Sequence, residues 1–140
     1  MGETESHLTE HLGKPALRAL IEAMYLIAYA DQEFSDVERR FFERSLRTLT
    51  RDRVDEQELN DILEDLQERE RREGLHACLS DIASRLDTPE SRLAAVVLAS
   101  DMAAADGVIE PSERELLTKL GKALQVDDQI VARALEGLER

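Results

Sequence analysis

Four acidic residues share one repeated spacing: Glu38 stands seven residues after Asp31, and Glu113 stands seven residues after Asp106. Each Asp follows an apolar stretch with helical spacing, and each Glu falls early in the next such stretch, so each pair flanks a short loop. Carboxylate and loop carbonyl oxygens are the ligands that hard divalent cations prefer. The four residues are therefore candidate ligands of a divalent cation of the calcium or magnesium type.

The same residues also have a purely structural interpretation. Glu38 and Glu113 suit the first turn of a helix, where a carboxylate caps backbone N–H groups and complements the helix dipole. Asp31 and Asp106 oppose the dipole at the end of the preceding helix, which costs up to about 1 kcal/mol unless an Asx turn or a bound cation offsets it. Local turn chemistry needs no ligand, so both explanations stay open at this point.

Two better-known metal patterns fit this chain poorly. The second loop has part of the spacing of an EF-hand, but the first and third ligand positions would be Met102 and Ala104. The stretch from His7 to His11 reads His-x-x-Glu-His, a helical zinc-peptidase pattern, but it lies at a terminus that is expected to fray. No Gly-rich phosphate loop and no Ser-His-Asp set stands out either. We therefore expect no enzyme.

The acidic pairs belong to a longer repeat. Residues 28–39 return 75 positions later as residues 103–114, and residues 54–57 return 72 positions later as residues 126–129. Apolar positions on both sides of the loops correspond as well. Two copies are too few for a solenoid, which needs at least about three. The repeat predicts one domain built from two related halves around a pseudo-twofold axis.

The spacing of the apolar residues predicts an all-α chain. These residues recur at i, i+3 and i+4 throughout, and no alternating pattern typical of strands is present. Prolines, capping residues and Gly74 mark the helix ends. We expect a compact single-domain bundle of about seven helices. Its parts are an N-terminal segment 1–14, half one at about residues 16–73, a bridging helix at about residues 74–86 and half two at about residues 88–139.

Two further segments carry expectations about burial. Residues 93–105 are apolar on nearly every side, so other helices should surround this one, with the matching helix of the first half beside it. Asp101 within it needs Arg18, Arg92 or a shared metal as its partner, or else an exposed side of the helix. Residues 65–73 are almost all charged, which indicates a solvated last turn of a helix.

Four arginines fall on one face of the helix that follows residue 35. Asp36 and Glu43 lie within pairing range of them, which explains most of this stripe as surface ion pairs. A docking site for an acidic partner is the alternative. The stripe consists of Arg40, Arg44, Arg47 and Arg51.

The charge balance limits the class of partner. A formal net charge of −13 repels a phosphate backbone, so we expect a protein partner and no nucleic acid. The apolar runs are far shorter than the roughly 20 residues of a membrane span. The acidic N-terminus is unlike a signal peptide. These features predict a cytoplasmic protein with no direct membrane span.

With its doubled Asp loop in an acidic, all-helical sequence of this size, the chain resembles the TerB family of tellurite-resistance-associated proteins. The resemblance covers about residues 16–138 and is strongest over residues 103–113. The first copy departs from the pattern with Gln32 in place of Gly and Phe34 in place of Ile. The resemblance implies a bundle of about seven helices with internal twofold symmetry, divalent-metal binding and association with membrane-linked stress-response complexes. Carried over by position, the implied metal-binding residues are Asp31, Glu38, Asp106 and Glu113.

TerB-like domains also occur as interaction modules in co-chaperones of the DjlA kind. The sequence therefore predicts a non-enzymatic TerB-like binding and stress-response module, with candidate cation sites at its two loops. The alternative is a protein–protein interaction adaptor with no metal site, in which the acidic residues only shape turns. A peripheral membrane complex is compatible with either prediction.

Overall fold

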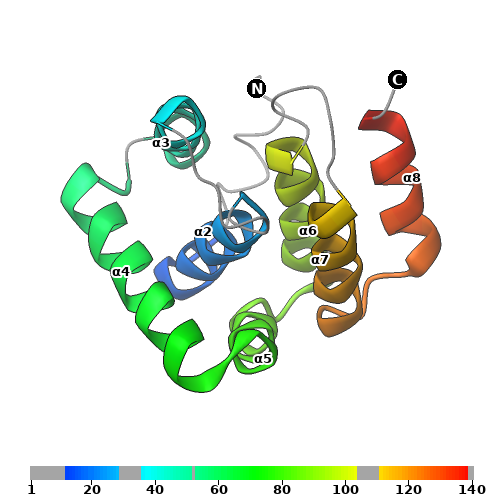
Figure 1. The fold of residues 1–140 in the computed structure, drawn as a ribbon. Helices are drawn as coiled ribbons and strands as arrows, with labels where there is room; N and C mark the ends of the chain where they lie inside the picture. The colour runs from blue at the N-terminus through cyan, green and yellow to red at the C-terminus, as the bar shows by residue number, and fades with distance from the viewer. Residues whose placement is uncertain (1–11, 29–35, 52, 104–110, 139–140) are drawn as a thin grey trace.

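The computed structural model describes residues 12–28, 36–51, 53–103 and 111–138 (Figure 1). These ranges contain seven α-helices and no strand, which confirms the predicted all-α bundle. The helices are α2 (Lys14–Ala28), α3 (Asp36–Thr50), α4 (Glu56–Glu73), α5 (Leu75–Arg85), α6 (Pro89–Ala103), α7 (Pro111–Ala123) and α8 (Asp128–Leu138).

Side chains cap the N-termini of α4 and α6, where the sequence predicts helix starts. Asp55 caps α4, since its Oδ1 accepts a hydrogen bond of 2.7 Å from the backbone N–H of Glu58. Before α6, the Thr88 hydroxyl accepts a hydrogen bond of 3.1 Å from the backbone N–H of Ser91. Each cap satisfies a backbone donor that the first helical turn leaves without a partner. Local side-chain chemistry thus fixes where these helices begin.

Gly74 separates α4 from the bridging helix α5, as the sequence predicts. Its φ of 91° lies in a region that residues with a Cβ rarely adopt, and its N–H donates to the Glu70 carbonyl at 2.9 Å. The chain can therefore reverse between the two helices within one residue. This turn brings α5 back against α4 and α2.

The core forms around α2 and α6, which pack most extensively against each other (Figure 1). Every residue of α2 from Ala19 to Ala28 is buried, including one carboxylate, Glu22. Tyr25 meets Phe42 of α3 edge to face, with ring centroids 6.1 Å apart. Each large apolar side chain buried in this way contributes roughly 1.5–3 kcal/mol, so α2 is the most heavily anchored helix of the described chain.

The helix boundaries follow the sequence repeat. The first residues of α6 and α7 lie 75 positions after those of α2 and α3, and the first residue of α8 lies 72 positions after that of α4. These are the offsets at which the sequence repeats. Superposition of the two halves about a pseudo-twofold axis stays a prediction.

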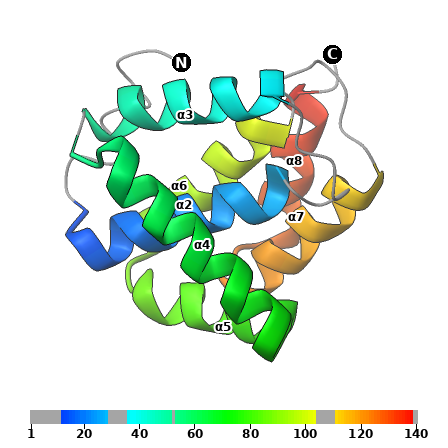
Figure 2. The ribbon, with the colours of Figure 1, turned by 60° about the vertical axis from the view of Figure 1, so that its left-hand side comes forward.

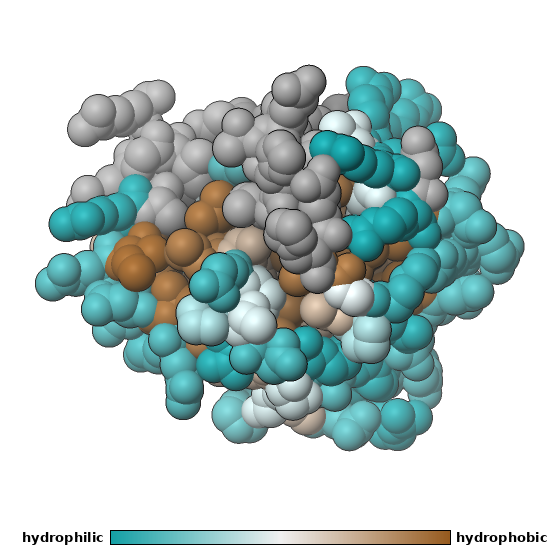
Figure 3. Space-filling model, turned by 180° about the vertical axis from the view of Figure 1, so that it is seen from behind, coloured by the Kyte–Doolittle hydropathy of each residue, from teal (hydrophilic) through white to brown (hydrophobic). Residues whose placement is uncertain are grey.

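The two halves pack differently. α7 packs against α2, α5, α6 and α8, whereas α3 packs appreciably only against α2 within the described chain. In Figure 2, α3 lies across the top of the molecule. From behind, apolar atoms also show at the surface on the side where α8 lies (Figure 3). The expectation that α6 is covered on every side is wrong, because Leu93 is 41% exposed.

Candidate functional site

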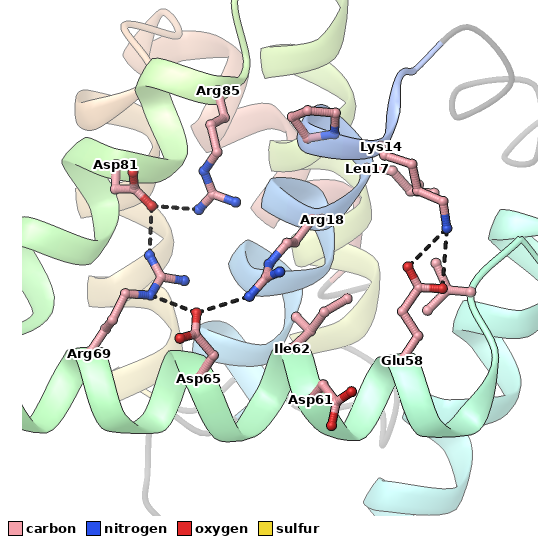
Figure 4. A pocket seen from close by; sticks show the side chains of 12 residues that line it. Lys14, Leu17, Arg18, Glu58, Asp61, Ile62, Asp65, Arg69, Asp81 and Arg85 are labelled. Carbon is pink, nitrogen blue, oxygen red and sulfur yellow. Dashed lines mark hydrogen bonds and ion pairs between the residues drawn. The ribbon is translucent and has the colours of Figure 1, made fainter.

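A groove of about 810 Å³ lies between α2, α4 and α5 (Figure 4). Its floor is apolar, with buried Leu17 from α2 and Ile62 from α4. Its rim is charged on all sides. At one end, Lys14 Nζ donates to Glu58 Oε2 at 2.9 Å, and both side chains are exposed to solvent.

At the other end of this groove, three arginines converge on Glu22, whose side chain is fully buried. Arg69 Nη2 and Arg85 Nη2 each donate to Glu22 Oε1 at 2.6 Å. Arg85 Nη1 donates to Oε2 at 2.9 Å, and Arg18 Nε reaches the same oxygen at 3.4 Å. A buried carboxylate is tolerated only when charge-assisted hydrogen bonds of this kind replace its hydration.

Two further carboxylates close the arrangement. Asp81 Oδ2 accepts from Arg69 Nη1 at 2.6 Å and from Arg85 Nη2 at 2.7 Å. Asp65 Oδ2 accepts from Arg18 Nη2 at 2.9 Å and from Arg69 Nε at 3.1 Å. Figure 4 shows the chain of contacts from Arg85 through Asp81, Arg69 and Asp65 to Arg18. We call these five residues and Glu22 the arginine–carboxylate cluster; three positive charges in it meet three negative ones.

The cluster keeps its arginines charged. Burial disfavours the charged form of Arg69 and Arg85, but the hydrogen bonds and Coulombic attraction of Glu22 outweigh this effect. The pKa of each guanidinium is therefore raised above its ordinary value. Because each of the three arginines already donates to two or more carboxylates, the cluster offers no spare cation to a ligand anion. Its evident role is to fasten α4 and α5 to α2.

Sequence reasoning missed this cluster, although a signal for it exists. Each of the three helices carries an acid–base pair at i, i+4, the spacing of side-chain neighbours on a helix. Within α2, the acidic member stands among apolar residues, which indicates burial. The three pairs are Arg18/Glu22, Asp65/Arg69 and Asp81/Arg85.

One expectation about charged residues is corrected here, and another stays a prediction. The segment 65–73 is not simply a solvated helix end, because Arg69 is only 18% exposed and faces α2. Arg18 donates to Glu22 and Asp65, and the partner of Asp101 stays a prediction. Arg92 donates to backbone carbonyls at the ends of α5 and α7, including that of Leu124 at 3.2 Å. Asp101 itself is half-buried in α6.

The arginine stripe on α3 also departs from expectation. Glu43 pairs with Arg39 at 3.3 Å rather than with a member of the stripe. Arg47 pairs across to Glu56 of α4 at 3.6 Å. Arg40 and Arg44 are exposed, and neither forms an ion pair with another residue that the structure describes. Surface pairing therefore explains only part of the stripe.

The candidate cation ligands lie mostly outside the described residues. Asp31 and Asp106 fall in the segments 29–35 and 104–110, and of Glu38 only the backbone is described, in the first turn of α3. Glu113 lies in the first turn of α7 with a half-buried side chain. Elsewhere in the described ranges, no three His, Cys, Asp or Glu side chains gather to hold a metal ion. His7 and His11 are also outside the described chain.

The model of the family described as "Tellurite resistance protein TerB" matches residues 43–136. The chain belongs to the TerB family. The matched span begins in α3 and ends in α8, so it includes Asp106 and Glu113 of the second TerB loop but not Asp31 and Glu38 of the first. No curated protein and no solved structure matches the chain. None of the described helices of this TerB-family chain is both long and apolar enough to pass through a membrane.

Proposed function

We propose that this chain is a non-enzymatic binding module of tellurite resistance that takes divalent cations at its two repeated acidic loops. The proposal rests first on where the flanking helices end. In Figure 2, the ends of α2 and α6 and the starts of α3 and α7 all lie on the right-hand side of the molecule. The chain segments that carry Asp31 and Asp106 thus leave from, and return to, one side of the bundle.

The charge at these helix ends supports a cation. Each helix C-terminus carries a partial negative charge equivalent to roughly half an electron, which a basic residue in the last turn usually offsets. α3, α4, α5 and α7 have such residues, whereas α2, α6 and α8 have none. The two helices that precede the acidic loops are thus uncompensated, and the Asp that follows each one adds further negative charge. A bound divalent cation would balance both.

A metal titration followed by unfolding tests this proposal. A cation that binds only the folded state raises its stability by RT ln(1 + [L]/Kd), or about 2.7 kcal/mol at a hundredfold excess over Kd. We expect calcium, magnesium, manganese or zinc at millimolar concentration to raise the melting temperature of the wild type. Asp106→Asn keeps the hydrogen bonds of an Asx turn but loses the charge, so it should fold normally and lose this response.

Glu64→Gln is the matched control, because Glu64 is an exposed carboxylate of α4 far along the chain from either loop. It makes the same kind of change in charge and should keep the full response to metal. Equilibrium dialysis with metal analysis gives the stoichiometry independently. If the wild-type melting curve ignores all four cations, the loops have only a turn-forming role and the cation proposal fails.

The second candidate function is a protein-interaction adaptor with no metal site. An exposed apolar groove between α6 and α8 favours it, since a groove of this kind marks an interaction surface. If metal does not raise the melting temperature of the wild type, the adaptor is the function that remains. The two functions are also compatible in one molecule.

A further inference from the structure

A second groove, of about 510 Å³, lies between α6, α8 and the turns that precede them. It contains Leu93 and Ile130, which are 41% and 43% exposed. Among the described residues, these are the two large apolar side chains that stand most open to solvent. Leaving both in water forgoes burial worth roughly 1–2 kcal/mol each, so the groove is a place where a partner would gain by binding.

The two grooves correspond position by position. Several residues that line the groove between α2 and α4 have counterparts, at the offsets of the repeat, that line the groove between α6 and α8. Three charged residues that line the first groove have apolar counterparts in the lining of the second groove. The corresponding pairs are Lys14 and Pro89, Arg18 and Leu93, Val54 and Val126, and Glu58 and Ile130.

In the first half, a helix covers the face beyond this groove. α5 packs against both α2 and α4, and Glu22 and Leu26 of α2 are buried there. Their counterparts on α6, Val97 and Asp101, are only half-buried. Apart from α7, which corresponds to α3, no helix in the described ranges packs against both α6 and α8. The place that corresponds to α5 is therefore free of any described helix.

We infer that the groove between α6 and α8, together with the neighbouring face of α6 that corresponds to the one covered by α5, binds a basic amphipathic helix of a partner protein. The bundle itself shows what fits such a face, since α5 is an amphipathic helix of 11 residues. Apolar residues at i, i+4 and i+7 of the partner would reach Leu93 and Ile130. Asp87 and Asp127 line this groove and are exposed, whereas Arg92, the basic residue in its lining, donates to backbone carbonyls of this chain, so the groove favours basic flanks on the bound helix.

Two other occupants fit less well. A second copy of this chain also carries a net charge of −13, and the two exposed apolar side chains fall far short of the roughly 800 Å² per partner of a stable interface. The N-terminal residues 1–11 contain Met1 and Leu8 as their only large apolar residues, too few for an apolar helix face. The inference does not depend on the cation proposal, because the groove lies away from the acidic loops in sequence.

Fluorescence anisotropy with a synthetic peptide tests the inference. The probe has the apolar pattern of α5 and lysine at its remaining positions, and a matched peptide has glutamate in place of lysine. We expect the lysine peptide to bind with a Kd of about 10–100 μM and the glutamate peptide at least about tenfold more weakly. A double variant, Leu93→Arg with Ile130→Glu, puts the residue types of Arg18 and Glu58 at the corresponding positions of the second groove. It should weaken binding of the lysine peptide at least about tenfold.

Ala132→Glu is the control, since Ala132 is exposed on α8 but does not line the groove. It should leave the affinity unchanged. Circular dichroism checks that each variant is folded, and the single variant Ile130→Ser replaces the double one if the latter unfolds. Equal binding of the two peptides, or undiminished binding by the groove variant, overturns the inference. So does a dimer in analytical ultracentrifugation that the groove variant dissociates, because the occupant would then be a second copy.

Discussion

The α3–α4 pair of the first half and the α7–α8 pair of the second half occupy corresponding positions in the repeat but pack differently. α7 carries Gly121 where α3 carries Leu46. A Cβ added to Gly121 would lie 2.7 Å from Cγ2 of Val131, so α8 approaches α7 too closely for any larger residue. Leu46 is buried at the corresponding position, and with Leu59 it lines a small cavity between α3 and α4. One change of side-chain size thus separates a close helix pair from a loose one.

A second difference concerns charge. The first half attaches α5 through a buried carboxylate and three arginines, whereas the second half has Val97 and Leu93 where the first has Glu22 and Arg18. The charged face is occupied by a helix of the same chain. The apolar face is open. The helices of the two sequence repeats thus begin at corresponding positions, but one face is an internal interface and the other is an accessible groove.

The largest effect is expected from Glu22→Gln. Gln keeps the shape of Glu but removes the charge that three arginines share, and breaking a buried ion pair on one side typically costs about 3–5 kcal/mol. We expect a loss of about 3 kcal/mol in the free energy of unfolding, measured by urea denaturation at neutral pH. At the corresponding position of the second half, Val97→Ala should cost only about 1 kcal/mol, because Val97 is not fully buried.

Equal losses for these two variants would break the comparison, since they would show that the charged face contributes no more than the apolar one. If Glu22→Gln unfolds at the same urea concentration as the wild type, the arginines hold α5 through Asp65 and Asp81 alone. The exposed variant Glu64→Gln should change stability by less than about 0.5 kcal/mol and controls for the loss of one negative charge.

The sequence predicts the helices far better than it predicts the site, and the reason is the range of the interactions. Caps such as Asp55 and stops such as Gly74 act within four residues, so their signals are local. Glu22 meets Arg69 and Arg85 from 47 and 63 residues away. Each i, i+4 pair of the cluster looks, by itself, like an ordinary surface pair, and only the packing of α2, α4 and α5 brings the three together.

For the candidate cation site, the sequence selects the residues but the described structure does not give their geometry. The repeat in the sequence selects Asp31, Glu38, Asp106 and Glu113, and the described helices place the ends of both loops on one side of the bundle. Three of those side chains lie outside what the structure describes, so their ligand geometry stays a prediction. The groove between α6 and α8 has one sequence signal, the lack of a polar side on the helix that contains Leu93, but this pattern by itself predicts full burial.

A smaller effect is expected from Gly121→Ala. The added methyl group would collide with the stiff, buried side chain of Val131, and overpacking of this kind costs about 1–3 kcal/mol. Replacing Gly by Ala inside a helix returns about 1 kcal/mol, so the net loss should be about 1 kcal/mol in thermal or urea unfolding. Adding Val131→Ala removes the colliding methyl group. The double variant should therefore lose less than the sum of the two single losses, and strict additivity would contradict the close approach of α7 and α8.

The smallest effect is expected from Glu58→Gln, which keeps the hydrogen bond of 2.8 Å from Lys14 Nζ to the Arg53 carbonyl and removes the charge from the exposed ion pair of Lys14 with Glu58. The two side chains are 60% and 41% exposed, so water and salt screen their attraction. We expect a loss of about 0.5 kcal/mol in urea unfolding at low salt and almost none at about 1 M salt. The loss caused by Glu22→Gln should persist at the same high salt, because no ion reaches a fully buried carboxylate. If both losses vanish together, the buried cluster is screened like a surface pair, and the contrast between a fixed charged face and an open apolar one no longer holds.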